Sequence, residues 1–125
     1  MSCYITRTAS YLPGPAVEND EIERFIGSLD GEAATKEKIL SMNGIVRRHY
    51  AQDHLQQKTH DVYGLAARAA QQCLSDYKEA DSITYLAAGT TYTPLAAPGF
   101  ASILHHRLQA DGYLNYPVEI SSHAG

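Results

Sequence analysis

The chain carries six histidines, the side chain that most often binds metals and moves protons near neutral pH. His105 and His106 are adjacent, so on a helix their side chains point about 100° apart and cannot share one ion. His49, His54 and His60 are not one helical turn apart, and no cysteine pair with zinc-ligand spacing lies near them. We therefore predict no metal site, and nothing in the sequence calls for a cofactor.

Two cysteines, Cys3 and Cys73, are the possible thiol nucleophiles. Cys73 falls on the apolar face of a predicted helix, so we expect it to point into a core rather than to react. Two isolated cysteines do not make a disulfide framework and indicate a reducing compartment. No basic start with a long apolar run opens the chain, and no apolar stretch is long enough to span a membrane. We expect a cytoplasmic protein.

Polar residues at the predicted ends of two strands are the remaining candidates for chemistry. His123 follows the last predicted strand, and α/β proteins bind ligands where strands end. An ordinary loop histidine near solvent explains His123 equally well. The loop at residues 89–94 has too few glycines and no lysine for a phosphate cradle. We expect its hydroxyls to bond the loop's own backbone.

Four basic residues lie close together in the sequence: Lys36, Lys38, Arg47 and Arg48. They could bind a phosphorylated carrier, or they could form a solvated face. The sequence leaves both interpretations open and favours the solvated face. A nucleic-acid-binding protein would show a basic stripe, and this chain has a net charge of −4. We therefore expect no nucleic-acid partner.

Hydrophobic periodicity predicts an alternating α/β chain of one domain at most. The expected elements are strands at 4–11, 45–50, 83–88 and 117–120, and helices at 22–29, 35–43, 59–77 and 98–108. Strand 83–88 is a continuous apolar run, which is typical of a parallel strand buried on both faces. The long helix is expected to bury one face, made of Val62, Leu65, Ala66, Ala69, Cys73 and Tyr77.

Five stretches, in this order, resemble one known family. They are 9–13 followed by Asn19, which is expected to start a helix, then 43–49 (Asn-Gly-Ile-Val-Arg-Arg-His), 59–74, 83–108 and 117–122. This series is similar to the N-terminal half of the β-ketoacyl-acyl-carrier-protein synthase III family. The resemblance implies, for residues 1–125, a partial thiolase-like α/β fold, with an incomplete and mostly parallel central sheet flanked by helices.

The same resemblance implies what the parent protein does. In that family the strand matching 117–122 is followed by a catalytic cysteine at the N-terminus of a buried helix, where the helix dipole stabilises the thiolate. Residues 1–125 are then expected to end just before the nucleophile, with a histidine and an asparagine in the C-terminal half. The implied reaction is a Claisen-type condensation of an acyl thioester with malonyl carrier protein, and this chain alone is expected to be inactive.

The resemblance also implies positions that contact substrate. The family's donor-binding tryptophan and arginine match Lys38 and Met42, while Arg48 is retained, so a carrier protein or an unusual thioester is favoured over coenzyme A as donor. Small residues in the loop that lines the acyl tunnel indicate room for a longer or bulkier acyl chain. The substrate-binding candidates are Lys38, Met42, Arg48, Leu95, Ala96, Ala97 and His123.

Partners implied by the resemblance are an acyl carrier protein, an acyl thioester, the C-terminal portion and a second copy in a homodimer. Two alternatives remain at this point. One is a non-catalytic, shortened homologue that binds a condensing enzyme or a carrier protein. The other is an unrelated small α/β domain that binds a ligand at its strand ends.

Overall fold

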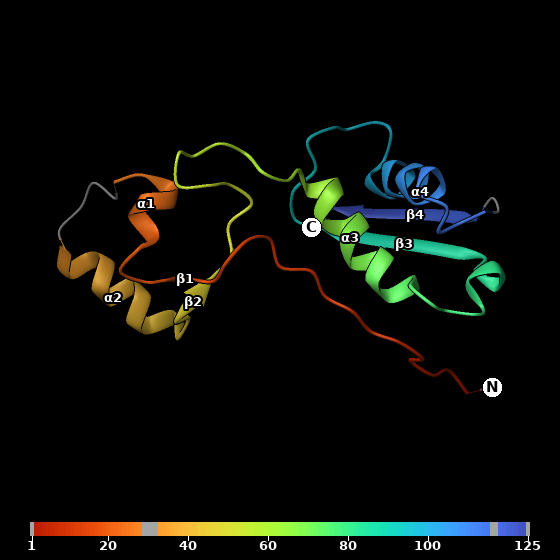
Figure 1. Cartoon of the computed structure of the whole chain (residues 1–125), viewed down its shortest axis with the longest axis horizontal. Coiled ribbons are helices and arrows are strands. Elements are labelled where there is room, and N and C mark those ends of the chain that lie inside the picture. Colours follow the sequence, from red (N-terminus) through yellow and green to blue (C-terminus); the bar gives the residue numbers. More distant parts are fainter. Residues whose placement is uncertain (1, 29–32, 116–117, 125) are drawn as a thin grey trace. The chain divides into compact units, whose positions relative to one another are not determined.

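The computed structural model describes residues 2–28, 33–115 and 118–124 (Figure 1). The chain forms two compact units. We call Leu12–Asp61 the small unit, and Met1–Tyr11 with Val62–Gly125 the sheet unit. The small unit contains β1 (Val17–Glu18), α1 (Ile22–Ile26), α2 (Ala33–Asn43) and β2 (Arg47–Arg48); the sheet unit contains α3 (Val62–Leu74), a 3₁₀ turn (Ala80–Ser82), β3 (Tyr85–Thr90), α4 (Phe100–Ala110) and β4 (Glu119–Ala124).

In the small unit, β1 pairs antiparallel with β2, and Val17 lies opposite Arg48. Gly44 directly follows α2 with φ +65°, a conformation that favours glycine, so the predicted Asn-Gly helix end is confirmed. The Asn43 side chain accepts a hydrogen bond from the Ile45 amide at 2.8 Å. This turn directs the chain from α2 back towards β2.

Asn19 has a different local role from the expected one. The residue that precedes α1 is Glu21, and no side chain caps this helix. The Asn19 amide instead donates to the Ile45 carbonyl at 2.8 Å, and its side-chain oxygen accepts from the Arg48 guanidinium. Asn19 therefore ties the loop after β1 to the segment between α2 and β2.

In the sheet unit, β3 and β4 are parallel and are joined through α4. The register runs from Tyr85 opposite Glu119 to Thr90 opposite Ala124. Helix α4 packs on both strands, and α3 packs on α4 (Figure 1). The buried cluster consists of Tyr63, Ala67, Ala88, Phe100, Ala101, Leu104, Leu108 and Leu114. This α/β unit confirms the predicted fold class.

Several details differ from the sequence prediction. Residues 4–11 form no strand; Arg7 of this segment donates to the Ser75 carbonyl at 2.9 Å and lies over the Tyr77 ring. A strand needs a neighbouring strand to pair its backbone, and this segment has none among the described residues. In α3 the buried residues are Tyr63 and Ala67, so the buried face is rotated from the predicted one. No helix in the described part of the chain is long and apolar enough to cross a bilayer.

The N-terminus of α4 is capped by the strand that follows it. Gly99 precedes the helix and has no side chain to cap it. The Ser122 hydroxyl of β4 accepts a hydrogen bond from the Ala101 amide at 2.8 Å. A Cβ at Gly99 would lie 2.9 Å from the Ser122 Oγ, so glycine permits this close approach. Gly99 and Ser122 together fix the start of α4 against β4.

We expect Leu108→Ala to destabilise the sheet unit by about 2–5 kcal/mol, because this side chain is fully buried and its truncation leaves a cavity. Urea denaturation measures the change. Leu55→Ala is the control, since Leu55 is 66% exposed and its loss removes little packing. Equal effects of the two substitutions would contradict the assigned core.

We expect Gly99→Ala to cost about 1–3 kcal/mol through the contact with Ser122. Ser122→Ala should cost about 1 kcal/mol by removing the cap. The double variant should be less unstable than the sum of the two, since the clashing oxygen is gone. Gly89→Ala is the control, because a Cβ there has no neighbour within 4 Å. Strict additivity would show that Gly99 and Ser122 do not interact.

Candidate functional site

A cavity lies where the two parallel strands end and α4 begins. Parallel strands bring their carboxyl ends to one edge of a sheet, which is the usual ligand-binding edge in α/β proteins. The cavity has a volume of about 170 Å³. We call it the strand-end cavity; its lining residues are Thr90, Thr93, Leu95, Ala96, Gly99, Phe100, Ser122 and His123.

The loop after β3 supplies one wall and is held by its own hydroxyls. The Thr90 hydroxyl donates to the Tyr92 carbonyl at 2.7 Å and accepts from the Tyr92 amide at 3.1 Å. The Thr93 hydroxyl donates to the Leu95 carbonyl at 2.8 Å. The prediction that these hydroxyls bond the loop backbone is confirmed, and the bonds position Leu95 and Ala96 at the cavity.

His123 lies near the end of β4, opposite Gly89, so its predicted position at a strand end is confirmed and the loop alternative is not. The strand is longer than its apolar residues suggested, because its pairing with β3 continues through the polar residues that follow Ile120. The His123 side chain is exposed, and its Nε2 lies 3.0 Å from the Ser121 hydroxyl. The ring therefore shares a face of β4 with Ser121, whereas the Ser122 side chain points to the other face, toward α4.

The structure brings together Leu95, Ala96 and His123 from the predicted substrate-binding set. Ala97, which precedes Pro98 through a cis peptide, is not among the cavity's lining residues. The sequence prediction missed Gly99 and Ser122, which also line the cavity. A glycine in the first turn of the predicted helix 98–108 was the available signal for the close approach at Gly99.

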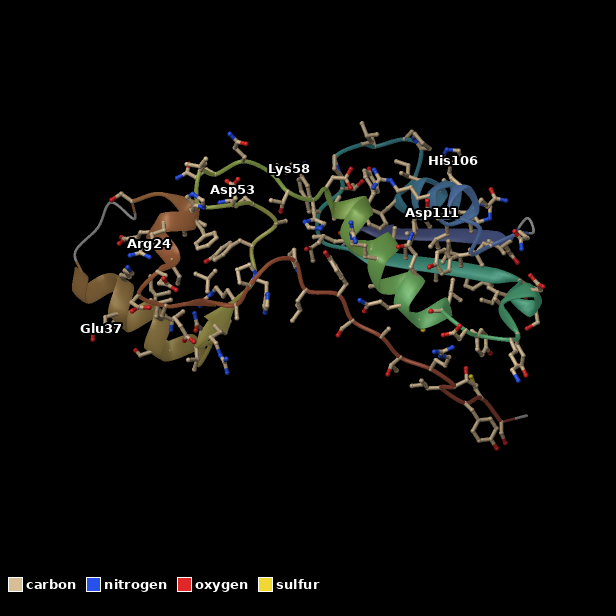
Figure 2. The ribbon with its side chains drawn as sticks, in the orientation of Figure 1. Arg24, Glu37, Asp53, Lys58, His106 and Asp111 are labelled. Carbon is tan, nitrogen blue, oxygen red and sulfur yellow. The ribbon has the colours of Figure 1, made fainter. Side chains whose placement is uncertain are left out.

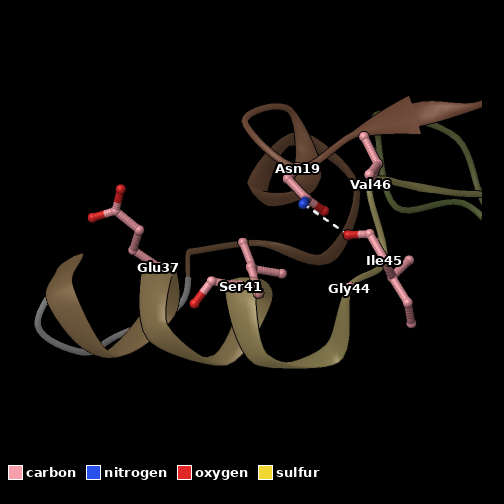
Figure 3. A pocket seen from close by; sticks show the side chains of 7 residues that line it. Asn19, Glu37, Ser41, Gly44, Ile45 and Val46 are labelled. Atoms are coloured by element: carbon pink, nitrogen blue, oxygen red, sulfur yellow. Dashed lines mark hydrogen bonds between the residues drawn. The ribbon is translucent and has the colours of Figure 1, made fainter.

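A second hollow lies in the small unit. This groove of about 410 Å³ is shown in Figure 3, where Asn19 reaches the Ile45 carbonyl across it. Its lining residues are Asn19, Glu37, Leu40, Ser41, Gly44, Ile45 and Val46. We call it the α2 groove. Its surface is mainly apolar, and among its described lining residues the charged side chain is that of Glu37.

The three donor-site candidates, Lys38, Met42 and Arg48, are not among the described residues that line the α2 groove. Lys38 and Met42 are exposed on α2, and Met42 is 77% exposed. Arg48 is half-buried and donates to the Asn19 side chain. Arg48 thus acts on the groove through Asn19 rather than by facing it directly.

The other basic residues of this region have acidic neighbours. Lys36 lies 3.2 Å from Glu23, and Arg47 lies 3.7 Å from Glu18. These partly exposed ion pairs indicate a solvated face of mixed charge rather than a phosphate-binding site. Polar and charged side chains such as Glu37 and Asp53 in the small unit, and His106 and Asp111 in the sheet unit, are spread over the surface (Figure 2). Within the described residues, no group of three or more metal-binding side chains could hold an ion.

No protein-family model matches the chain. It is 31% identical over 118 residues to the β-ketoacyl-[acyl-carrier-protein] synthase III of Rickettsia akari, covering 94% of this chain and 33% of that protein. It is 31% identical over 120 residues to that of Caulobacter vibrioides, covering 95% and 34%. The match to that of Xanthomonas oryzae is 34% identical over 104 residues, covering 83% and 29%.

Among solved structures, the chain resembles AbyA1, a tetronic acid condensing enzyme, with a TM-score of 0.65 and 23% identity. The match covers 95% of this chain and 34% of that one. The chain thus spans about a third of the length of the proteins it matches. In sequence the chain resembles part of β-ketoacyl-[acyl-carrier-protein] synthase III, and its fold is similar to part of the thiolase-like condensing enzyme AbyA1.

Proposed function

We propose that this chain is part of an acyltransferase that condenses an acyl thioester with malonyl carrier protein through a cysteine nucleophile. The observation that carries the proposal is the 31% identity over 118 residues to a β-ketoacyl-[acyl-carrier-protein] synthase III. The parent enzyme is expected to act in the cytoplasm as a homodimer, with an acyl carrier protein and the C-terminal portion as its other partners.

The first step needs a thiolate at the strand-end cavity. The thiolate attacks the acyl carbonyl, a new carbon–sulfur bond forms as the donor's carbon–sulfur bond breaks, and the donor's thiolate takes up the proton that the cysteine had released. Cys3 is exposed in a segment without regular structure, and Cys73 is partly buried on α3; neither lines the cavity. The proposal therefore places the nucleophile beyond residue 125, and this chain alone is expected to be inactive.

We assign the acyl group to the strand-end cavity and the donor's pantetheine arm to the α2 groove. Leu95, Ala96 and His123 support the first assignment because they line the cavity, and Ala97 belongs to the same loop. Lys38, Met42 and Arg48 are proposed to flank the arm at the groove.

A carrier-bound donor suits this groove better than coenzyme A. The groove offers apolar side chains such as Leu40 and Val46 to a neutral arm, and its charged lining residue, Glu37, repels the phosphates of a nucleotide. The carrier protein would deliver the arm without placing a nucleotide beside the carboxylate.

The test begins with the source gene, read past the codon for Gly125. We expect a cysteine codon within a few residues. The polypeptide encoded by the complete gene should gain the mass of one acyl group when incubated with an acyl carrier protein thioester. Replacement of that cysteine by alanine should abolish the gain. A stop codon directly after Gly125 would overturn the catalytic proposal and support a shortened homologue that binds a condensing enzyme or a carrier protein.

We expect Glu37→Gln to improve acyl loading from coenzyme A by roughly fivefold, because one repulsive charge worth about 1 kcal/mol is removed. Loading from the carrier protein should change little. The measurement is the initial loading rate with each donor at low ionic strength. Glu79→Gln is the control, since this glutamate lies in the sheet unit and not in the groove. If wild-type protein already prefers coenzyme A, the proposed donor is wrong.

A further inference from the structure

A further cavity lies in the small unit and shares no lining residue with the α2 groove. Its volume is about 260 Å³, and we call it the aromatic cavity after Phe25 and Tyr50, which line it. We propose that the aromatic cavity binds a small aromatic cation, that is, a planar ring that carries an ammonium group. This inference does not rest on acyl transfer and goes beyond the proposed function.

Two half-buried aromatic rings supply the apolar surface of the cavity. Phe25 on α1 and Tyr50 after β2 stack nearly parallel, with ring centroids 5.5 Å apart and planes 14° apart. Aromatic rings pack favourably on such stacked pairs, and ring faces also attract cations. The volume is slightly below the ~300 Å³ at which drug-sized sites begin, which suits a ligand of one or two rings.

The loop at residues 51–59 forms another part of the wall and is closed by its own bonds. The Thr59 amide donates to the Ala51 carbonyl at 2.9 Å, and Gln52 lies opposite Lys58 in an antiparallel bridge. The Gln52 side chain also donates to the Phe25 carbonyl, which ties the loop to α1. Because these bonds are made without a ligand, binding needs little ordering of the loop.

Asp53 places a negative charge on this loop. Its Oδ1 accepts hydrogen bonds from the Leu55 and Gln57 amides, each at 2.9 Å. Its other oxygen has no hydrogen-bond or ion-pair partner in the described part of the chain. Asp53 is half-buried and lines the cavity, so the two amides hold a carboxylate there with one oxygen available to a ligand. Hydrogen bonds from an ammonium to a carboxylate are among the stronger ones in proteins.

The charges of the lining favour a cation over other ligands. Besides Asp53, the titratable lining residues are His54 and His60, and no lysine or arginine is among the described lining residues. A phosphate or carboxylate ligand would therefore meet a like charge at Asp53. A neutral ring would desolvate the carboxylate without pairing it, which costs free energy. A ring with an ammonium group packs on Phe25 and Tyr50 and also pairs the carboxylate.

The test uses three probes that share one ring system and differ in charge: tryptamine, indole and indole-3-acetate. Each is titrated by calorimetry into the polypeptide encoded by the complete gene, at about pH 8 to keep positive charge on His54 and His60 low. We expect tryptamine to bind about tenfold more tightly than indole, and indole-3-acetate to bind most weakly. Asp53→Asn, which retains an oxygen to accept both loop amides, should bring the ratio of tryptamine to indole affinity to near one.

Two variants serve as controls. Asp81→Asn makes the same change in the 3₁₀ turn of the sheet unit and should leave the ratio unchanged. Lys58 lies on the same loop as Asp53 but is exposed and does not line the cavity (Figure 2). Lys58→Gln removes a repelling charge near the cavity, so it should not weaken tryptamine binding.

The outcomes are decisive for the wild-type protein as well as for the variants. If tryptamine does not bind, or binds no more tightly than indole, the proposed cation site is overturned. If the preference for tryptamine survives Asp53→Asn, the cation binds elsewhere and the proposal also fails. Loading of a cysteine from a thioester does not depend on this cavity, so failure of either proposal leaves the other standing.

Discussion

The hydrogen bond from the Ala101 amide to the Ser122 hydroxyl joins the fold of the sheet unit to its cavity. A parallel strand pair requires a crossover, and α4 is that crossover between β3 and β4. Leu104 and Leu108 bury one face of the helix, and this packing is not directional. A directional bond at its first turn, with Gly99 allowing the close approach, sets its position. The same contact places the Ser122 oxygen at the cavity wall.

The sequence predicted correctly those elements that depend on residues close together in the chain. Phe100, Leu104 and Leu108 recur at helical spacing, and Gly112 follows α4 with φ +75°, so both the helix and its end were predictable. The segment at 4–11 has strand-forming residues, yet a strand also needs a partner, and that depends on tertiary structure. Helix α3 has alanine or another small or apolar residue on several sides, so its sequence did not determine which face is buried.

The candidate site shows the same division between local and distant determinants. The threonine-rich loop was predictable because each hydroxyl bonds a carbonyl two residues away. The Ser122 cap joins residues 21 apart in the sequence, and no local pattern predicts such a contact. Arg48 matched a motif by residue type, but its bond to Asn19 depends on the pairing of β1 with β2. The motif could therefore identify Arg48 by residue type but not the side chain that it contacts.

The sequence of β3 predicted a strand buried on both faces, because the face turned away from the helices also carries apolar and small residues. Leu86 and Ala88 face the helical layer, whereas Tyr85, Ala87 and Gly89 alternate with them and are exposed. A solvated sheet face usually carries polar side chains, and this one carries apolar and small ones. Small residues at 87 and 89 would let another backbone or helix approach closely. In the part of the chain that the structure describes, β3 therefore buries one face, and the prediction of burial on both faces holds for that face alone.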